Sequence, residues 1–168
     1  MFEINGNLFT EGSGLSNIET FQKAVLNVRG YYLARLESEF KEDIGLYVDN
    51  ATSGSGATPI ITPVLNQILV IKLCISSDSP EAQIAYQFAH EYMHYIFFCK
   101  YGLEKPLADN REETICSAAS LIVLRDLYPT FFTAFDNYTR TLSDNAYREG
   151  AYLAENVNYD INILANMI

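Results

Sequence analysis

The sequence predicts an α+β fold, with a long N-terminal helix, a few short strands and then four further helices. Three patterns predict it. Apolar residues recur at helical spacing over residues 17–40, and a β-branched, nearly all-apolar run occupies residues 67–76. After residue 80, long helical patterns are separated by helix start and stop signals.

The first element is an amphipathic helix over residues 17–40. Gly30 weakens it, because glycine in a helix interior loses more backbone entropy than other residues. Its apolar positions are Phe21, Val25, Val28, Tyr32, Leu33 and Leu36.

Two strands and a loop follow. Residues 44–50 read as a strand, and 60–63 as a short second one. The segment between them, 51–59, holds small residues, two glycines and a terminal proline, which predicts either a flap over a cleft or a plain connection. The strongest strand prediction falls on residues 67–76.

The next helix is predicted over residues 80–100. Ser79 is a suitable N-cap, Pro80 suits the first helical position, and Glu81 favours the positive helix start. Gly102 is a suitable stop.

A further helix begins after Asp109 or Asn110, either of which can cap it, and Pro129 ends it. The remaining residues predict two more helices and a tail. No internal repeat or linker divides the chain, so residues 1–168 are expected to form a single domain.

Charge and composition restrict the partners and the compartment. The net charge is −10 and the 11 basic residues are dispersed, so neither nucleic acid nor an anionic membrane is expected as a partner. The longest apolar run, 68–75, is too short to cross a bilayer. The first residues lack the pattern of a signal peptide, and the odd number of cysteines, without CxxC spacing, suits free thiols; both favour a cytoplasmic protein.

The only two histidines, His90 and His94, lie four residues apart within the predicted helix over 80–100. On a helix this spacing leaves them about 40° apart around the axis, side by side on consecutive turns. Two imidazole nitrogens in that arrangement can bind one Zn²⁺ ion, while Glu91 lies about 100° round from His90 and can reach a metal-bound water. The sequence HEYMH is an HExxH motif, a metalloprotease signature when it lies on a helix.

A third protein ligand is required. In the metzincin pattern HExxHxxGxxH, the glycine would fall on Phe97 and the third histidine on Lys100, so that pattern is excluded. Since no histidine remains, the ligand is expected to be a carboxylate or a thiolate. Glu112 and Glu113, at the start of the next helix, are the carboxylate candidates.

At this point the chain resembles the gluzincin metallopeptidases, in which a downstream helix supplies a glutamate after HExxH. Glu113 stands 19 residues after His94, with 18 residues between them, which matches the HExxH-x18-E spacing of the aminopeptidase branch. The run EETICSAASLIVL is also similar to the corresponding helix of small bacterial and phage ImmA/IrrE-type peptidases. The tryptophan and glycine that flank the aminopeptidase glutamate are missing, so exopeptidase activity does not carry over.

Helix capping bears on the choice between the two glutamates. With Asp109 as N-cap, Glu112 falls at the third helical position and completes a capping box, which leaves Glu113 free. With Asn110 as N-cap, Glu113 takes the capping role. Glu113 would share a face with small residues that allow close helix approach, namely Cys116, Ser117 and Ser120. Cys116 as a thiolate ligand is a further alternative.

The resemblance implies a zincin-like fold, with a small mixed sheet packed by the long N-terminal helix, the zinc helix and further C-terminal helices. It also implies one catalytic Zn²⁺ held by His90, His94 and Glu113, and a zinc-bound water that attacks a peptide bond with Glu91 as general base.

The partner would be a protein or peptide substrate of an endopeptidase, with the strand at 67–76 bordering the cleft and offering its edge to an extended peptide. The candidate oxyanion donors are Tyr128, Tyr138, Tyr147 and Tyr152. The alternative function is a zinc-containing, non-proteolytic sensor or protein-binding module.

Overall fold

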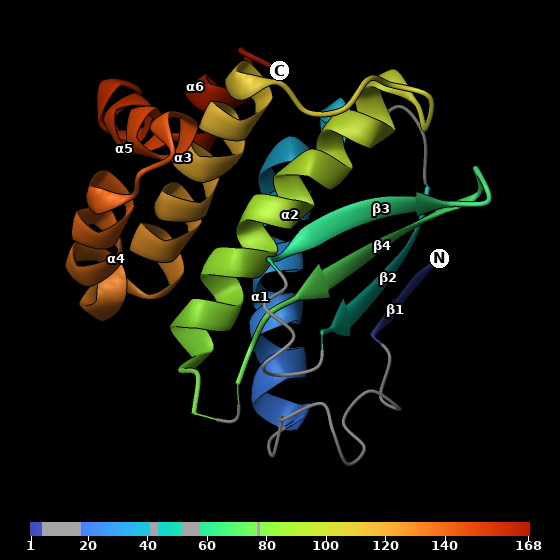
Figure 1. Cartoon of the computed structure of the whole chain (residues 1–168), viewed down its shortest axis with the longest axis horizontal. Helices are drawn as coiled ribbons and strands as arrows, with labels where there is room; N and C mark the ends of the chain where they lie inside the picture. The colour runs from blue at the N-terminus through green and yellow to red at the C-terminus, as the bar shows by residue number, and fades with distance from the viewer. Residues whose placement is uncertain (5–17, 41–43, 52–57, 77) are drawn as a thin grey trace.

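The structure, a computed structural model, describes residues 1–4, 18–40, 44–51, 58–76 and 78–168 (Figure 1). Within these residues the α+β prediction is confirmed, since a four-stranded mixed sheet is combined with six α-helices. Figure 1 shows helix α2 between the sheet on one side and the C-terminal helices on the other. Helix α2 therefore contacts both halves of the molecule.

The sheet contains three parallel strands and one antiparallel strand at its edge. Strand β1 (Phe2–Ile4) pairs in parallel with β2 (Gly45–Asn50), and β2 pairs in parallel with β4 (Ile68–Leu73). Strand β3 (Ile60–Val64) pairs antiparallel with β4, so the order is β1-β2-β4-β3. The three predicted strands are confirmed, although β4 ends three residues early.

Two features of the sheet and its connections were not predicted or could not be compared with the prediction. Strand β1 was not predicted, because three residues are too few to show a period-2 pattern. The expected flap or connection over 51–59 falls mostly on residues 52–57, which lie outside the described residues.

The edge strand of the sheet is β3, which corrects the expectation that the strand at 67–76 would offer its edge to a peptide. Strand β4 lies between β2 and β3, so both of its edges are paired. The chain reverses from β3 into β4 through Leu65 and Asn66, both with positive φ. Strand β3 also contains Pro63, a residue that sheets tolerate mainly at their edges.

One face of the sheet packs into the hydrophobic core and the other is more exposed. The inward side chains alternate along each strand, as expected for a half-buried sheet. They are Leu46 and Val48 of β2 and Leu69, Ile71 and Leu73 of β4. At the end of this layer Asn50 is buried, where its amide donates to the carbonyl of Ile75 and accepts from the Ile75 N–H.

The predicted N-terminal helix is helix α1 (Ile18–Leu36), which is followed by a short 3₁₀ turn at Glu37–Glu39. Helix α2 (Glu81–Tyr101) confirms the helix predicted over 80–100, and it ends at Gly102, whose φ is +88°. The predicted start was wrong by one residue. Pro80 is extended and precedes the helix, while the Ser79 hydroxyl accepts from the Ser76 N–H instead of capping.

The C-terminal helices are α3 (Asn110–Leu127), α4 (Pro129–Thr141), α5 (Asn145–Asn156) and the short α6 (Ile161–Ala165). Asp109 caps α3, and its side chain accepts from the Glu112 N–H at 2.8 Å. This selects the Asp109 frame over the Asn110 frame. Among the described residues, no helix combines the length and the apolar character needed to cross a bilayer.

Helices α3 and α5 approach closely where α5 carries Gly150. A β-carbon placed on Gly150 would lie 2.5 Å from Cβ of Ser117 and 3.0 Å from the backbone nitrogen of Ala118. Since both neighbours belong to a helix interior, neither can move without disturbing α3. Gly150 therefore sets the distance between the two helices.

We expect Gly150→Ala to lower the free energy of unfolding by about 1–3 kcal/mol, because the added methyl group overpacks the contact with α3. The matched control is Gly30→Ala in α1, where an added β-carbon meets nothing within 4 Å. There the change is expected to stabilise by about 0.5–1 kcal/mol, since alanine loses less backbone entropy. Urea denaturation of both variants measures this, and equal effects would contradict the assigned contact.

Candidate metal centre

The two histidines lie on the same face of α2, as their spacing predicted. Their ring centroids are 5.0 Å apart, and each residue is only 5% exposed. The side chain of Glu113, in the first turn of α3, reaches both rings. Its Oε2 lies 3.2 Å from His90 Nε2, and its Oε1 lies 3.5 Å from His94 Nε2.

These three side chains could hold one metal ion. Their candidate ligand atoms all lie within 4.8 Å of one another. Two ligands that are each about 2 Å from a tetrahedral zinc ion are about 3.3 Å apart. The observed nitrogen–oxygen separations of 3.2 and 3.5 Å match that value. Two imidazoles and one carboxylate are also the donor set of many catalytic zinc sites, and the donor chemistry therefore fits zinc.

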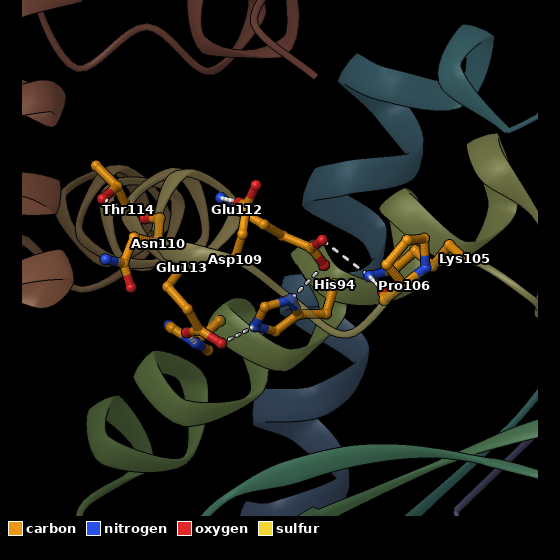
Figure 2. Close-up of polar contacts among 9 residues, drawn as sticks. His94, Lys105, Pro106, Asp109, Asn110, Glu112, Glu113 and Thr114 are labelled. Atoms are coloured by element: carbon orange, nitrogen blue, oxygen red, sulfur yellow. Dashed lines mark hydrogen bonds and ion pairs between the residues drawn. The ribbon is translucent and has the colours of Figure 1, made fainter.

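Glu112 approaches His94 from the other side of the ring (Figure 2). Its Oε1 lies 2.8 Å from His94 Nδ1, while its Oε2 accepts from Lys105 Nζ at 2.8 Å. The predicted capping box is therefore only half right: Asp109 caps the Glu112 N–H, but the Glu112 carboxylate contacts His94 and Lys105. With Nδ1–H donating to Glu112, Nε2 is the His94 nitrogen that faces Glu113 and that would bind a metal once its proton is displaced.

The charges of this cluster are strongly coupled. Burial lowers the pKa of His94, but Cys116, Glu112 and Glu113 oppose that effect, and the net result is a raised pKa. Burial raises the pKa of the Cys116 thiol to about 12, so at neutral pH this thiol is uncharged and we assign the effect on His94 to the two carboxylates. Burial also opposes ionisation of Glu113, yet hydrogen bonds from both histidines hold its pKa well below the usual range. A cation that binds here therefore displaces a proton from His94.

Glu91 lies beside this cluster without joining it. The residue is 4% exposed, and it lines the cavities on both sides of the histidines. Burial raises the pKa of its carboxyl, the two histidines lower it, and Glu113 raises it, with a net upward shift. Glu91 is therefore a buried carboxyl group beside the metal-binding group that is not itself one of its members.

The small residues of α3 face two different helices. Cys116 lies beside His94 on the side of α2, whereas Ser117 contacts Gly150 of α5. Ser117 therefore serves the close approach of α5, which the sequence did not indicate. Cys116 does not join the metal-binding group formed by the described residues, which consists of His90, His94 and Glu113.

Of the four candidate tyrosines, Tyr147 lies nearest to the histidines. Its ring stacks on His90 with centroids 5.2 Å apart and an interplanar angle of 3°. Burial raises the pKa of Tyr147, and Glu113 and Glu91 raise it further, so the phenol keeps its proton. Tyr138 lines one cavity at a greater distance along α4, whereas Tyr128 donates to Glu81 and Tyr152 lies under Arg140.

Two cavities meet at the histidines. The larger cavity, of about 650 Å³, is bounded by α2, α4 and α5, and the smaller cavity, of about 330 Å³, by α2, β3 and the loop before α3. Pro59, His90, Glu91 and Tyr147 line both. The cluster therefore lies in the middle of a groove along α2.

Lys105 was missed by sequence reasoning. It lies in the loop between α2 and α3, with its side chain only 6% exposed and its ammonium 4.6 Å from the ring centroid of Phe98. It forms the outer end of a chain of contacts that runs through Glu112 to His94 (Figure 2). A single lysine in a loop carries no sequence signal that distinguishes it from a solvated one.

Comparison with protein-family models, with curated proteins and with solved structures finds no match to this chain. The assignment of the site therefore rests on the side-chain geometry and on the motif.

We expect the protein, purified without chelator, to bind about one Zn²⁺ ion per chain. Glu113→Gln should abolish tight binding, because the amide carries no charge. Glu112→Gln should weaken binding about 10- to 100-fold, since it removes only the partner that orients His94. Competition titration against a chromophoric chelator measures both affinities. The control is Glu149→Gln, a change at an exposed residue of α5. Wild-type affinity in Glu113→Gln would contradict the ligand set.

The Lys105–Glu112 pair gives a separate prediction about stability. Lys105→Met should lower the free energy of unfolding by about 3 kcal/mol, because the buried Glu112 carboxylate loses its ammonium partner and keeps only its contact with His94. In Lys105→Met/Glu112→Gln part of that loss should be recovered, since no unpaired charge remains. Denaturant unfolding of the metal-free proteins measures the cycle; strictly additive losses would show that the two residues are not coupled.

Proposed function

We propose that this protein is a zinc-dependent metallopeptidase that hydrolyses a peptide bond, with His90, His94 and Glu113 as zinc ligands. One observation carries the proposal: two imidazoles and a carboxylate converge within 4.8 Å, with nitrogen–oxygen separations of 3.2 and 3.5 Å, while a fourth group, Glu91, lies beside them without being needed as a ligand. Structural zinc sites use all four positions for protein ligands, whereas catalytic sites leave one open.

In the proposed mechanism the metal ion, Glu91 and Glu112 have different roles. A bound Zn²⁺ supplies Lewis acidity, which lowers the pKa of a coordinated water and polarises the substrate carbonyl. The Glu91 carboxylate accepts the proton of the attacking water and then donates it to the leaving amine. Glu112, held by Lys105, fixes the orientation of the His94 ring throughout.

Two further features support a peptide as substrate. The smaller cavity is lined by Ile60, Ile61 and Pro63 of the edge strand β3, so an extended peptide paired with β3 would pass in front of Glu91. Tyr147, next to His90, places a protonated phenol on the opposite side of the groove. That hydroxyl is the best-placed donor for the oxyanion that forms during attack.

Glu91→Gln should abolish peptide hydrolysis, with a loss of at least about 10²-fold, while zinc content remains that of the wild type. The amide keeps the shape of the side chain but cannot accept the proton. Mass spectrometry of new termini in a peptide library made from a digested proteome, together with metal analysis, measures both quantities.

The control is Glu149→Gln, an exposed change on α5 that should alter neither quantity. If Glu91→Gln cleaved peptides at the wild-type rate, the proposed mechanism would be contradicted. Zinc-loaded wild-type protein that cleaves no member of the library would instead favour a zinc-containing sensor or protein-binding module.

A further inference from the structure

The larger cavity has an apolar wall that begins directly beside the metal centre. At one end it is lined by His90, Glu91 and Tyr147, and the wall continues along α4. The side chains that form this wall are Tyr86, Ala134, Phe135, Tyr138 and Leu142. Rings of Tyr86 and Phe135 contact each other with centroids 5.0 Å apart, so this wall is packed.

The polar atoms of two side chains beside this wall are already engaged within the protein. The Tyr86 hydroxyl lies 2.8 Å from Oγ1 of Thr139. The amide of Gln87 accepts from the Cys74 N–H at 2.9 Å and donates to the Cys74 carbonyl at 3.2 Å. Tyr86 and Gln87 therefore offer mainly carbon surface to a ligand.

The two cavities differ in the charged side chains that line them. Among the described residues that line the larger cavity, the acidic residues and the histidine are Glu91, Asp144 and His90, without a lysine or arginine. The smaller cavity instead contains Lys105 with Glu112 and Glu113. An acidic side chain in the larger cavity would meet the carboxylates of Glu91 and Asp144 and, among the described lining residues, no lysine or arginine. A basic one would have to leave water for a mostly apolar wall.

We propose that the larger cavity binds a bulky uncharged side chain, aromatic or long and aliphatic, of a peptide whose backbone lies at the metal centre. The inference rests on the proposed function in that the peptide is taken to be the substrate. Three observations carry it: a volume of about 650 Å³, the apolar wall along α4, and direct continuity with Glu91. The substrate class is therefore a peptide with a large apolar residue next to the cleaved bond.

The test measures binding, so that it does not depend on hydrolysis. Zinc-loaded wild-type protein is titrated with N-acetyl-phenylalaninamide, N-acetyl-lysinamide and N-acetyl-aspartamide, and backbone amide shifts are followed by NMR. The phenylalanine probe should bind at least about tenfold more tightly than the other two. Its shifts should map to the lining residues of α4 and α5.

Ala134→Phe is the blocking variant, because Ala134 is exposed on α4 and lines the cavity, so a ring there occupies the space without entering the core. It should weaken the phenylalanine probe at least about tenfold. The matched control, Thr133→Phe, places the same ring at an exposed neighbouring position that does not line the cavity, and the probe should bind as to wild type.

Equal binding of the three probes, shifts that map elsewhere, or an unchanged affinity in Ala134→Phe would each overturn the inference. The two proposals fail separately. If no peptide is hydrolysed but the phenylalanine probe maps to α4, the peptidase function fails and the cavity assignment stands. If peptides are cleaved without preference for a large apolar residue, the cavity assignment fails and the peptidase function stands.

Discussion

The arrangement around one imidazole determines how the helices of this protein must pack. His94 meets carboxylates from two consecutive residues, Glu112 on Nδ1 and Glu113 on the Nε2 side. Consecutive side chains on a helix diverge by about 100°, so both can reach one ring only if that ring lies between them, in front of the first turn of α3. The start of α3 must therefore face the middle of α2, and the Asp109 cap fixes where that turn begins.

The rest of α3 is held from both sides. Cys116 lies against α2, and Ser117 lies against Gly150 of α5, so small side chains allow close approach on each face. This packing positions the acidic first turn without relying on the metal. It also brings α5 near enough for Tyr147 to stack on His90. One helix thus relates the histidines, the carboxylates and the tyrosine in space.

The sequence was sufficient for features that depend on local spacing. The face shared by His90 and His94 follows from the period of a helix. The sequence limited the cap of α3 to Asp109 or Asn110, and the structure selects Asp109. Features that depend on long-range packing were missed. The local sequence does not show that the Lys105 side chain turns inward and contacts Glu112. It also does not show that the strand after Thr58 and Pro59 pairs with β4 and becomes the edge strand of the sheet.

Pro63 has a consequence for how the protein behaves in concentrated solution. Proline occurs in edge strands because its missing N–H is harmless only where it faces away from the ladder. The outer edge of β3 therefore lacks one donor close to the hairpin turn. A second molecule that tried to continue the sheet would find an interrupted row of partners, which discourages self-association and amyloid-like stacking. The part of that edge before Pro63 contains Ile60 and Ile61, which line the smaller cavity together with the histidines.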